Sequence, residues 1–322
     1  MRAFDSLRGS RYVTNENDTI GEFAVSQPSE KSVLVYDIGG SHVSAAVCTG
    51  CDFRLGAVVS AAHPAEQTSE AFIDLLHIIG TEASHGFNEI HGAELAFPGP
   101  FDYAAGVSHL THKLPYLLGV DVRAALAERF GWEQADVRFL NDAAAYLLGE
   151  VGAGAGRGVE RVVCITLGTG IGSGFAVDGR VVTSGPGVPP GGEIWDYPYR
   201  GGILEDTLST RAMQASYQSR TGNLREVAEI AASVPSDKDA REVFTEFGHE
   251  LGQAFRTILA TFAPQVVVLG GGISRSSHLF LPAAEQELQG IKMELCISEL
   301  MDNAPLVGAG VAWFSASSPV AV

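Results

Sequence analysis

The chain has 322 residues, of which 46% are hydrophobic and 18% charged, and this balance indicates a globular α/β protein with two domains. The formal net charge is −17 and no cluster of Lys and Arg offsets it, so we expect no nucleic acid as a partner. No apolar run is as long as a membrane span and no signal pattern opens the chain, so we expect no membrane attachment and a cytoplasmic location. The spacing of the four cysteines indicates neither a disulfide framework nor an evident zinc site. They are Cys48, Cys51, Cys164 and Cys296.

The first third of the chain predicts a polar tail and then strands around one helix. Residues 1–30 are polar and without periodicity, which is typical of a loosely ordered tail. Residues 33–47 have the pattern of an apolar strand, a polar glycine bend and a second apolar strand, and residues 55–61 predict a third strand. Apolar residues recur at helical spacing over 70–79, and residues 90–96 predict a short strand.

Two polar segments then follow strands. The Pro-Gly-Pro sequence at 98–100 is rigid and open, which is typical of a loop that contacts a small molecule and equally of a plain surface turn. A helix over 122–130, between an Asp cap and a Gly stop, precedes a strand over 137–140 and the pair Asn141-Asp142. Ligands of α/β folds bind at the carboxyl ends of strands, so this pair is either a ligand contact or a helix start capped by Asp142.

The central stretch, residues 162–179, predicts a hairpin with a phosphate-binding bend. Its two apolar runs flank glycines at 168, 170, 172 and 174, and such a bend exposes backbone N–H groups to an anion, with Thr169 and Ser173 as further donors. The segment is not a P-loop, because no Lys follows the glycines and the chain continues as a strand. One such hairpin is equally typical of a tight turn. Residues 33–47, however, form a second hairpin of this kind, and two such hairpins suggest two similar halves of the chain that close on one nucleotide.

The last third of the chain alternates predicted helices and strands. A strand over 266–269 runs into three glycines at 270–272, a bend on which a flat ring can lie. The remaining elements are expected as helices over 224–232, 239–262, 282–289 and 306–314 and a strand over 291–297.

Seven short motifs occur in a fixed order: DxGG at 37–40, PGPFD at 98–102, Asn-Asp-Ala at 141–143, LGTGIGSG at 167–174, GGE at 191–193, GILE at 202–205 and VVLGGGIS at 267–274. Together they resemble the ROK (repressor, open reading frame, kinase) family of sugar kinases, within the actin-like ATPase superfamily, over residues 32–314. The resemblance implies an α/β, ribonuclease H-like fold of two domains around a cleft. Residues 31–145 would form the first domain, joined by the last helix at 306–316, and residues 146–305 the second. The family's repressors carry a winged helix, for which residues 1–30 are too short.

The resemblance also implies roles for individual residues. Asp142 matches the general base that takes the proton of the sugar hydroxyl, and Asp37 lies near Mg²⁺, which it would hold through water. The residues expected to bind sugar are Gly99, Asn141, Asp142, Glu193, Asp196 and Glu205. Those expected to bind the nucleotide are Gly39, Gly40, Ser41, Gly168, Thr169, Gly170, Gly271 and Gly272. ATP and Mg²⁺ are therefore the expected cofactors, with a small-molecule sugar and a nucleotide as partners.

Two departures from the family pattern concern the segment after Glu193. Many members have a His three residues later and a Gly before it, whereas this chain has Asp196 and Trp195. Many also carry a cysteine-rich zinc loop, whereas residues 196–204 contain no cysteine, so we expect no structural zinc. The loop is expected to be held instead by Trp195, Tyr197, Tyr199 and its prolines.

The leading interpretation is an ATP- and Mg²⁺-dependent hexokinase of the glucokinase type. Relatives act on fructose, N-acetylglucosamine, N-acetylmannosamine or allose, and Asp196 leaves the sugar open. A polyphosphate-dependent glucokinase is an alternative, because that branch also lacks the zinc loop, although a long polyanion favours a basic groove. A sugar-sensing protein without catalysis is disfavoured by the intact Asn-Asp pair and both glycine bends. Relatives assemble, so a homodimer or homotetramer is expected.

Overall fold

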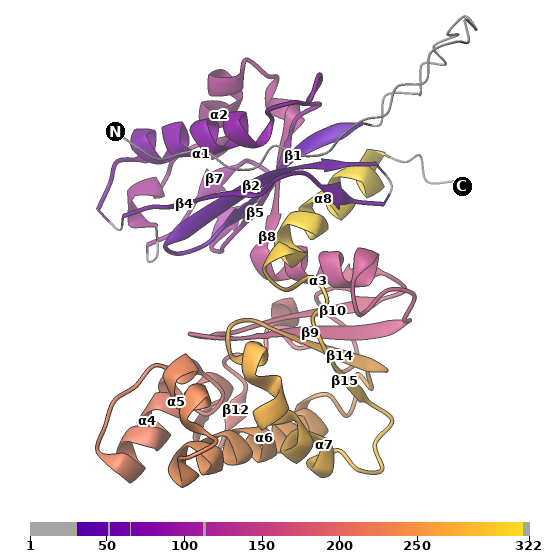
Figure 1. Ribbon diagram of the computed structural model, residues 1–322. Helices are drawn as coiled ribbons and strands as arrows, with labels where there is room; N and C mark the ends of the chain where they lie inside the picture. Colours follow the sequence, from indigo (N-terminus) through magenta and orange to yellow (C-terminus); the bar gives the residue numbers. More distant parts are fainter. Residues whose placement is uncertain (1–30, 51, 65, 112–113, 318–322) are drawn as a thin grey trace, which may run out of the picture. The chain divides into compact units, whose positions relative to one another are not determined.

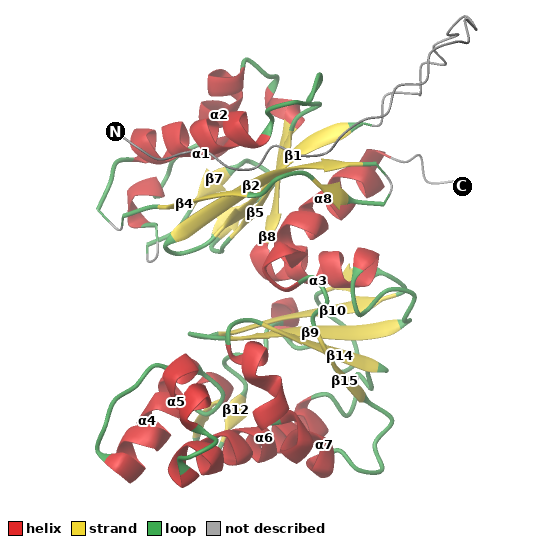
Figure 2. Ribbon diagram, viewed as in Figure 1, coloured by secondary structure: helices red, strands yellow, loops and turns green. Residues whose placement is uncertain are grey.

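The structure, a computed structural model, describes residues 31–50, 52–64, 66–111 and 114–317. The predicted tail over 1–30 and Cys51 lie outside these residues. Two β-sheets carry the architecture, and helices pack against both faces of each sheet (Figures 1 and 2). Within the described part of the chain, no helix is both long and apolar enough to span a membrane.

The first sheet has the strand order β3-β2-β1-β5-β8, with β4 also paired to β2. β1 and β2 form an antiparallel hairpin, and β5 and β8 extend the sheet in parallel from β1. Every residue of β5 is buried, as expected of a central parallel strand covered on both faces. The strands are β1 (Ser32–Ile38), β2 (His42–Thr49), β3 (Arg54–Leu55), β4 (Val59–Ala62), β5 (Ala93–Phe97) and β8 (Val137–Asn141).

The second sheet repeats this plan, with the order β11-β10-β9-β14-β15. β9 and β10 form the antiparallel hairpin, and β14 and β15 continue in parallel from β9. The two predicted glycine hairpins therefore hold equivalent positions in two sheets of the same topology. The strands are β9 (Arg161–Leu167), β10 (Ile171–Val177), β11 (Arg180–Val182), β14 (Val266–Gly270) and β15 (Glu294–Ile297).

Helices bury the apolar faces of both sheets. α1 and α2 form one core with the first sheet, while residues of α8 pack on its opposite face against Val33, Val35 and Cys48. On the second sheet, α4 to α7 contribute to the large core of one face, and α3 packs on the other. The helices are α1 (Ser69–Ala83), α2 (Val122–Phe130), α3 (Asp142–Ala153), α4 (Thr210–Thr221), α5 (Val227–Ser233), α6 (Lys238–Ile258), α7 (Leu281–Glu287) and α8 (Ala304–Ser317). Two short hairpins complete the fold: β6 (Phe101–Asp102) with β7 (Val107–Ser108), and β12 (Pro198–Tyr199) with β13 (Gly202–Ile203).

α3 and α8 pack directly against each other, and glycines make this close approach possible (Figure 1). A Cβ at Gly308 of α8 would lie 1.7 Å from the carbonyl oxygen of Ala145 in α3. A Cβ at Gly149 of α3 would lie 2.2 Å from the carbonyl oxygen of Ala304. Only a residue without a side chain allows the backbones to come this near.

Three local predictions were wrong. The single strand expected over 55–61 is two short strands, β3 and β4, separated at Gly56, whose N–H donates to the carbonyl of Val47. The helix α4 was not predicted, because only Met213 and Tyr217 of its twelve residues are buried and no apolar stripe marks it. Gly172 and Gly174 lie inside β10 rather than in the bend.

Candidate functional site

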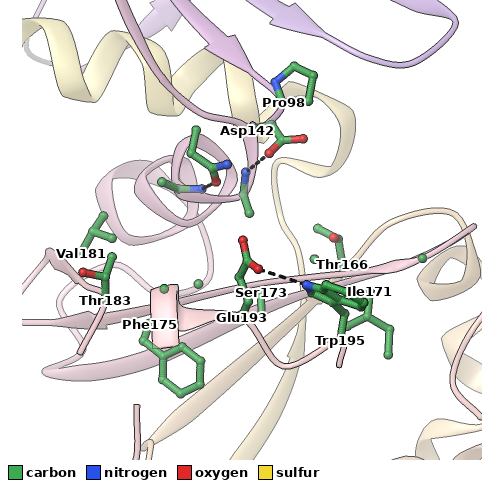
Figure 3. Close-up of a pocket in the computed structure, with 18 of the residues that line it drawn as sticks. Pro98, Asp142, Thr166, Ile171, Ser173, Phe175, Val181, Thr183, Glu193 and Trp195 are labelled. Carbon is green, nitrogen blue, oxygen red and sulfur yellow. Dashed lines mark hydrogen bonds between the residues drawn. The ribbon is translucent and has the colours of Figure 1, made fainter. Parts of the chain in front are cut away.

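A pocket of about 1070 Å³ lies among the segments for which the sequence predicted sugar contacts. It is at the upper end of the ~300–1,000 Å³ that small-molecule sites span, so it has room for more than one small sugar. Figure 3 shows Asp142 and Glu193 extending their carboxylates into it, with Trp195 beside Glu193. Among its lining residues are Pro98, Gly99, Pro100, Asn141, Asp142, Gly170, Ser173, Glu193, Trp195 and Glu205.

Asn141 and Asp142 form the junction of β8 and α3. The side chain of Asn141 caps the helix, because its Oδ1 accepts from the N–H of Ala144 at 3.1 Å. The alternative in which Asp142 caps the helix was therefore wrong: Asp142 is the first helical residue, and its Oδ1 accepts from the N–H of Ala143 at 2.9 Å. A backbone N–H thus fixes the Asp142 carboxylate at a helix N-terminus, where negative charge is favourable.

Tyr103 is a member of this site that the sequence analysis missed. Its hydroxyl accepts from Nδ2 of Asn141 at 3.2 Å and donates to the carbonyl of Phe97 at 3.1 Å. Burial raises the pKa of Tyr103 to about 12; the Asn141 hydrogen bond lowers it, whereas the charges of Asp142 and Glu193 raise it. Tyr103 is therefore a neutral phenol, and its hydroxyl orients the amide of Asn141.

Glu193 follows a short 3-10 turn, Pro190–Gly192, in which Gly191 and Gly192 have φ of +71° and +77°. Ser173 of β10 holds this turn: its hydroxyl donates to the carbonyl of Gly192 at 2.7 Å and accepts from the N–H of Ile194 at 3.1 Å. The expected role of Ser173 as a phosphate donor was wrong, because its hydroxyl proton is already donated within the protein. Ser173 instead sets the position from which Glu193 enters the pocket.

Glu205 joins the larger pocket to the second glycine bend. Its Oε2 accepts from the N–H of Ile171 at 3.0 Å, and a Cβ at Gly170 would lie 2.5 Å from the same oxygen. The bend also closes on itself, through the Gly168 N–H and the Gly170 carbonyl at 3.1 Å. The position of the bend therefore depends on a carboxylate that faces the pocket.

The first glycine bend is held by a buried histidine instead. His63, 4% exposed, has its Nε2 3.0 Å from the carbonyl oxygen of Gly39, and its own N–H donates to the carbonyl of Ser41 at 2.9 Å. Nδ1 of the same ring lies 3.2 Å from the hydroxyl of Tyr116, which accepts from Nε2 of Gln67 at 2.7 Å. A chain of hydrogen bonds therefore fixes this bend.

A second pocket, of about 560 Å³, brings together two residues predicted for the nucleotide side, Asp37 and Gly271. Burial raises the pKa of Asp37 to about 7, with further contributions from the charges of Asp142 and Asp302. Gly271 has φ of +80°, and a Cβ there would lie 2.4 Å from the carbonyl oxygen of Leu167, so the bend after β14 lies directly on the end of β9. An acidic group of this kind favours a cation beside it.

The comparison with known families matches residues 33–315 to the ROK family. The chain belongs to the ROK family. A glucokinase from Thermotoga maritima is 30% identical to it over 245 residues, which cover 66% of this chain and 75% of that protein. The predicted family and fold class are thereby confirmed, and the chain is a sugar phosphotransferase at the level of its family.

Two solved structures extend this likeness along most of the chain. The ROK hexokinase from Thermus thermophilus superimposes with a TM-score of 0.73 at 26% identity, over 89% of this chain and 99% of that one. The inorganic polyphosphate/ATP-glucomannokinase from Arthrobacter sp. strain KM gives a TM-score of 0.65 at 26% identity, over 89% of this chain and 100% of that one.

The predicted ROK site residues fall into three groups. The larger pocket is lined by Gly99, Asn141, Asp142, Gly170, Glu193 and Glu205. The smaller pocket is lined by Asp37 and Gly271. Neither pocket is lined by Gly39, Gly40, Ser41, Gly168, Thr169, Gly272 or Asp196.

The segment that follows Glu193 is held by side chains. The hydroxyl of Tyr199 donates to Oε2 of Glu250 in α6 at 2.7 Å, and Arg200 donates to both oxygens of the same carboxylate. Tyr197 packs on the large core of the second sheet. Among the described residues, no group of three or more His, Cys, Asp or Glu side chains is arranged to hold a metal ion. Trp195 differs from the tyrosines, because it lines the pocket.

Proposed function

We propose that this ROK protein is an ATP- and Mg²⁺-dependent hexose kinase with Asp142 as the general base. The observation that carries the proposal is the position of Asp142. Its carboxylate, fixed by the N–H of Ala143, lines one pocket together with Asn141, Glu193 and the Gly170 bend. A base on the hydroxyl, hydroxyl-binding side chains and backbone donors for phosphate are the parts that phosphoryl transfer to an alcohol requires.

In the proposed reaction, Glu193 and Asn141 bind hydroxyls of the sugar and orient the one that reacts. Asp142 accepts the proton of this hydroxyl while the hydroxyl oxygen forms a bond to the γ-phosphorus of ATP. The bond between that phosphorus and the β–γ bridging oxygen breaks, and ADP leaves with the electron pair. The N–H groups of Gly39 and Gly168 already donate within the two glycine bends, so other N–H groups of these bends would bind the phosphate oxygens.

The residues near the second pocket fit a magnesium nucleotide. Asp37 is a half-buried carboxylate whose pKa is raised to about 7, first by desolvation and then by the charges of Asp142 and Asp302. A Mg²⁺ ion, when bound, would neutralise charge on the nucleotide phosphates, and Asp37 would hold it through water. Proteins commonly bind this ion with one or two carboxylates plus substrate phosphates, so a larger set of protein ligands is not required.

The phosphoryl donor has one competing candidate, polyphosphate. The likeness to the polyphosphate/ATP-glucomannokinase favours it, whereas the formal net charge of −17 disfavours a long polyanion. Glucose is the first candidate for the sugar substrate, and fructose and the N-acetylhexosamines are the alternatives. A coupled assay over a panel of hexoses and N-acetylhexosamines, each with ATP and with polyphosphate, separates these candidates.

The Asp142→Asn variant tests the base. We expect kcat to fall by about 10²–10⁴-fold, the range typical of one acid–base group, because an amide accepts no proton. Nucleotide affinity should change little. The matched control is Asp178→Asn, in the turn after β10, where φ is +50° and Asn is well tolerated. Turnover by Asp142→Asn near that of the control would overturn the assignment.

A further inference from the structure

Trp195 is a large aromatic side chain exposed in a pocket. It lies between the 3-10 turn that carries Glu193 and the strand β12, and 40% of its surface is accessible. It lines the larger pocket together with Glu193 and Glu205. Figure 3 shows it beside Glu193. A tryptophan left partly exposed at a concave site offers both an apolar face and an N–H group to a ligand.

Trp195 makes hydrogen bonds to both carboxylate residues on its side of the pocket. Its indole Nε1–H donates to Oε2 of Glu193 at 3.0 Å, and its backbone carbonyl accepts from the N–H of Glu205 at 3.0 Å. The indole has only one donor, so this bond to Glu193 uses the whole polar capacity of the ring. The other oxygen of Glu193 then remains available for a hydroxyl group.

The neighbouring loop does not depend on the indole for its position. Tyr199 and Arg200 hold it to Glu250 of α6, and the N–H of Leu204 donates to the carbonyl of Tyr197 at 2.9 Å. The indole itself is therefore not needed as an anchor. Its remaining features are a hydrogen bond donated to Glu193 and an exposed surface that lines the pocket.

This inference rests on the proposed sugar kinase activity. We propose that Trp195 is the residue that positions the sugar: its N–H holds Glu193 in the orientation that receives hydroxyls, and its ring contacts the apolar face of the pyranose. Asp196, the next residue in the chain, lines neither pocket. Trp195 supplies a donor to Glu193 from the same segment and adds an apolar wall.

Four variants separate the two contributions: Trp195→Phe, Trp195→Ala, Glu193→Gln and the double variant of Trp195→Phe with Glu193→Gln. Trp195→Phe keeps a ring but removes the N–H, and Trp195→Ala removes both. We expect Trp195→Phe to raise the KM for the sugar about tenfold, from the loss of a hydrogen bond to a charged group, and Trp195→Ala to raise it further. The KM for ATP should stay within twofold. In the Glu193→Gln background, Trp195→Phe should have little additional effect, because its partner charge is already gone.

Intrinsic fluorescence gives a readout that does not require turnover. The other two tryptophans are away from the pocket: Trp132 stacks on Phe130, and Trp313 is 5% exposed beneath Arg138. We therefore expect titration with the preferred sugar, without nucleotide, to change the fluorescence of the native chain and to leave that of Trp195→Phe unchanged.

The two proposals fail in different ways. If the native chain shows the fluorescence change but transfers phosphate to no sugar, the kinase proposal fails and the role of Trp195 in sugar binding stands. If the kinase is active and no sugar alters the fluorescence, the role of Trp195 is overturned. Equal sugar KM values for the native chain and Trp195→Phe, or additive effects of Trp195→Phe and Glu193→Gln, also overturn it. Thermal melts of each variant report whether the fold is intact.

Discussion

The bend between β1 and β2 and the bend between β9 and β10 hold the same place in two sheets of one topology, but different side chains fix them. The ring of His63 lies within hydrogen-bonding distance of the Gly39 carbonyl in the first bend. In the second, the carboxylate of Glu205 accepts from the N–H of Ile171 and also lines the larger pocket. The second bend is thus linked to the predicted sugar site, whereas the first is not. Substitution of Glu205 should accordingly affect both substrates, whereas substitution of His63 should affect the nucleotide alone.

Glu205→Ala should give the largest effect and the broadest one. It removes both the acceptor of the Ile171 N–H and a predicted sugar ligand, so we expect kcat/KM to fall about 10²–10³-fold, with higher KM values for sugar and nucleotide alike. Steady-state kinetics with each substrate varied in turn measures this. Glu285→Ala, on the exposed surface of α7, is the control. A change confined to the sugar KM would show that the carboxylate does not fix the bend.

His63→Ala should have a smaller and more selective effect. The carbonyl of Gly39 loses its partner, so the first bend loosens, and we expect the KM for nucleotide to rise about tenfold while the KM for sugar stays within twofold. Equal increases for both substrates would contradict the separation of the two bends.

Two glycine substitutions sharpen the comparison further. A Cβ at Gly168 meets no atom within 4 Å, so Gly168→Ala should keep the native Tm but raise the nucleotide KM severalfold, because the new methyl lies where phosphate would approach. A Cβ at Gly39 would lie 2.9 Å from the carbonyl oxygen of His42, so Gly39→Ala should lower Tm by about 2–4 °C. Thermal melts and initial rates measure both effects. An unchanged Tm for Gly39→Ala would show that a Cβ there does not crowd the His42 carbonyl.

A separate prediction, on stability rather than on kinetics, is a dependence on pH that comes from Asp37. Its pKa is about 7 in the folded protein against an ordinary 3.8, so between about pH 4 and pH 7 the folded chain keeps a proton that the unfolded chain has lost. The contribution of Asp37 to the free energy of unfolding therefore falls as pH rises through this window and is level above it. Asp37→Asn should lack this fall. Denaturant titrations of the native chain and of Asp37→Asn at pH 5 and pH 8 measure the free energy of unfolding. An equal change between the two pH values in both chains would exclude the effect.

Much of the fold could be predicted from local patterns. The helix α2 begins and ends as expected, because Asp121 accepts from the N–H of Ala124 at its start and Gly131 takes a left-handed conformation at its end. Both hairpins were predicted from apolar runs around glycines. Patterns of this kind depend on residues that are near neighbours in the sequence, so they can be recognised in a single sequence.

The parts of the site that were missed depend on contacts across long sequence distances. His63 contacts a carbonyl 24 residues away, and Tyr103 contacts an amide 38 residues away. Neither residue lies in a motif, so no local signal marks it. The glycines of β10 were misread for a related reason: Gly174 leaves room for Leu147 of α3, and that helix cannot be placed on the strand from the strand's own sequence.

The packing of α8 on the first sheet has a consequence for synthesis of the chain. Val33 and Cys48 are covered by Leu306 and Trp313, which leave the ribosome more than 250 residues later. Until α8 has been made, one face of the first sheet is therefore uncovered and open to water and to chaperones. A chain that stops before Ala304 would present that apolar face permanently.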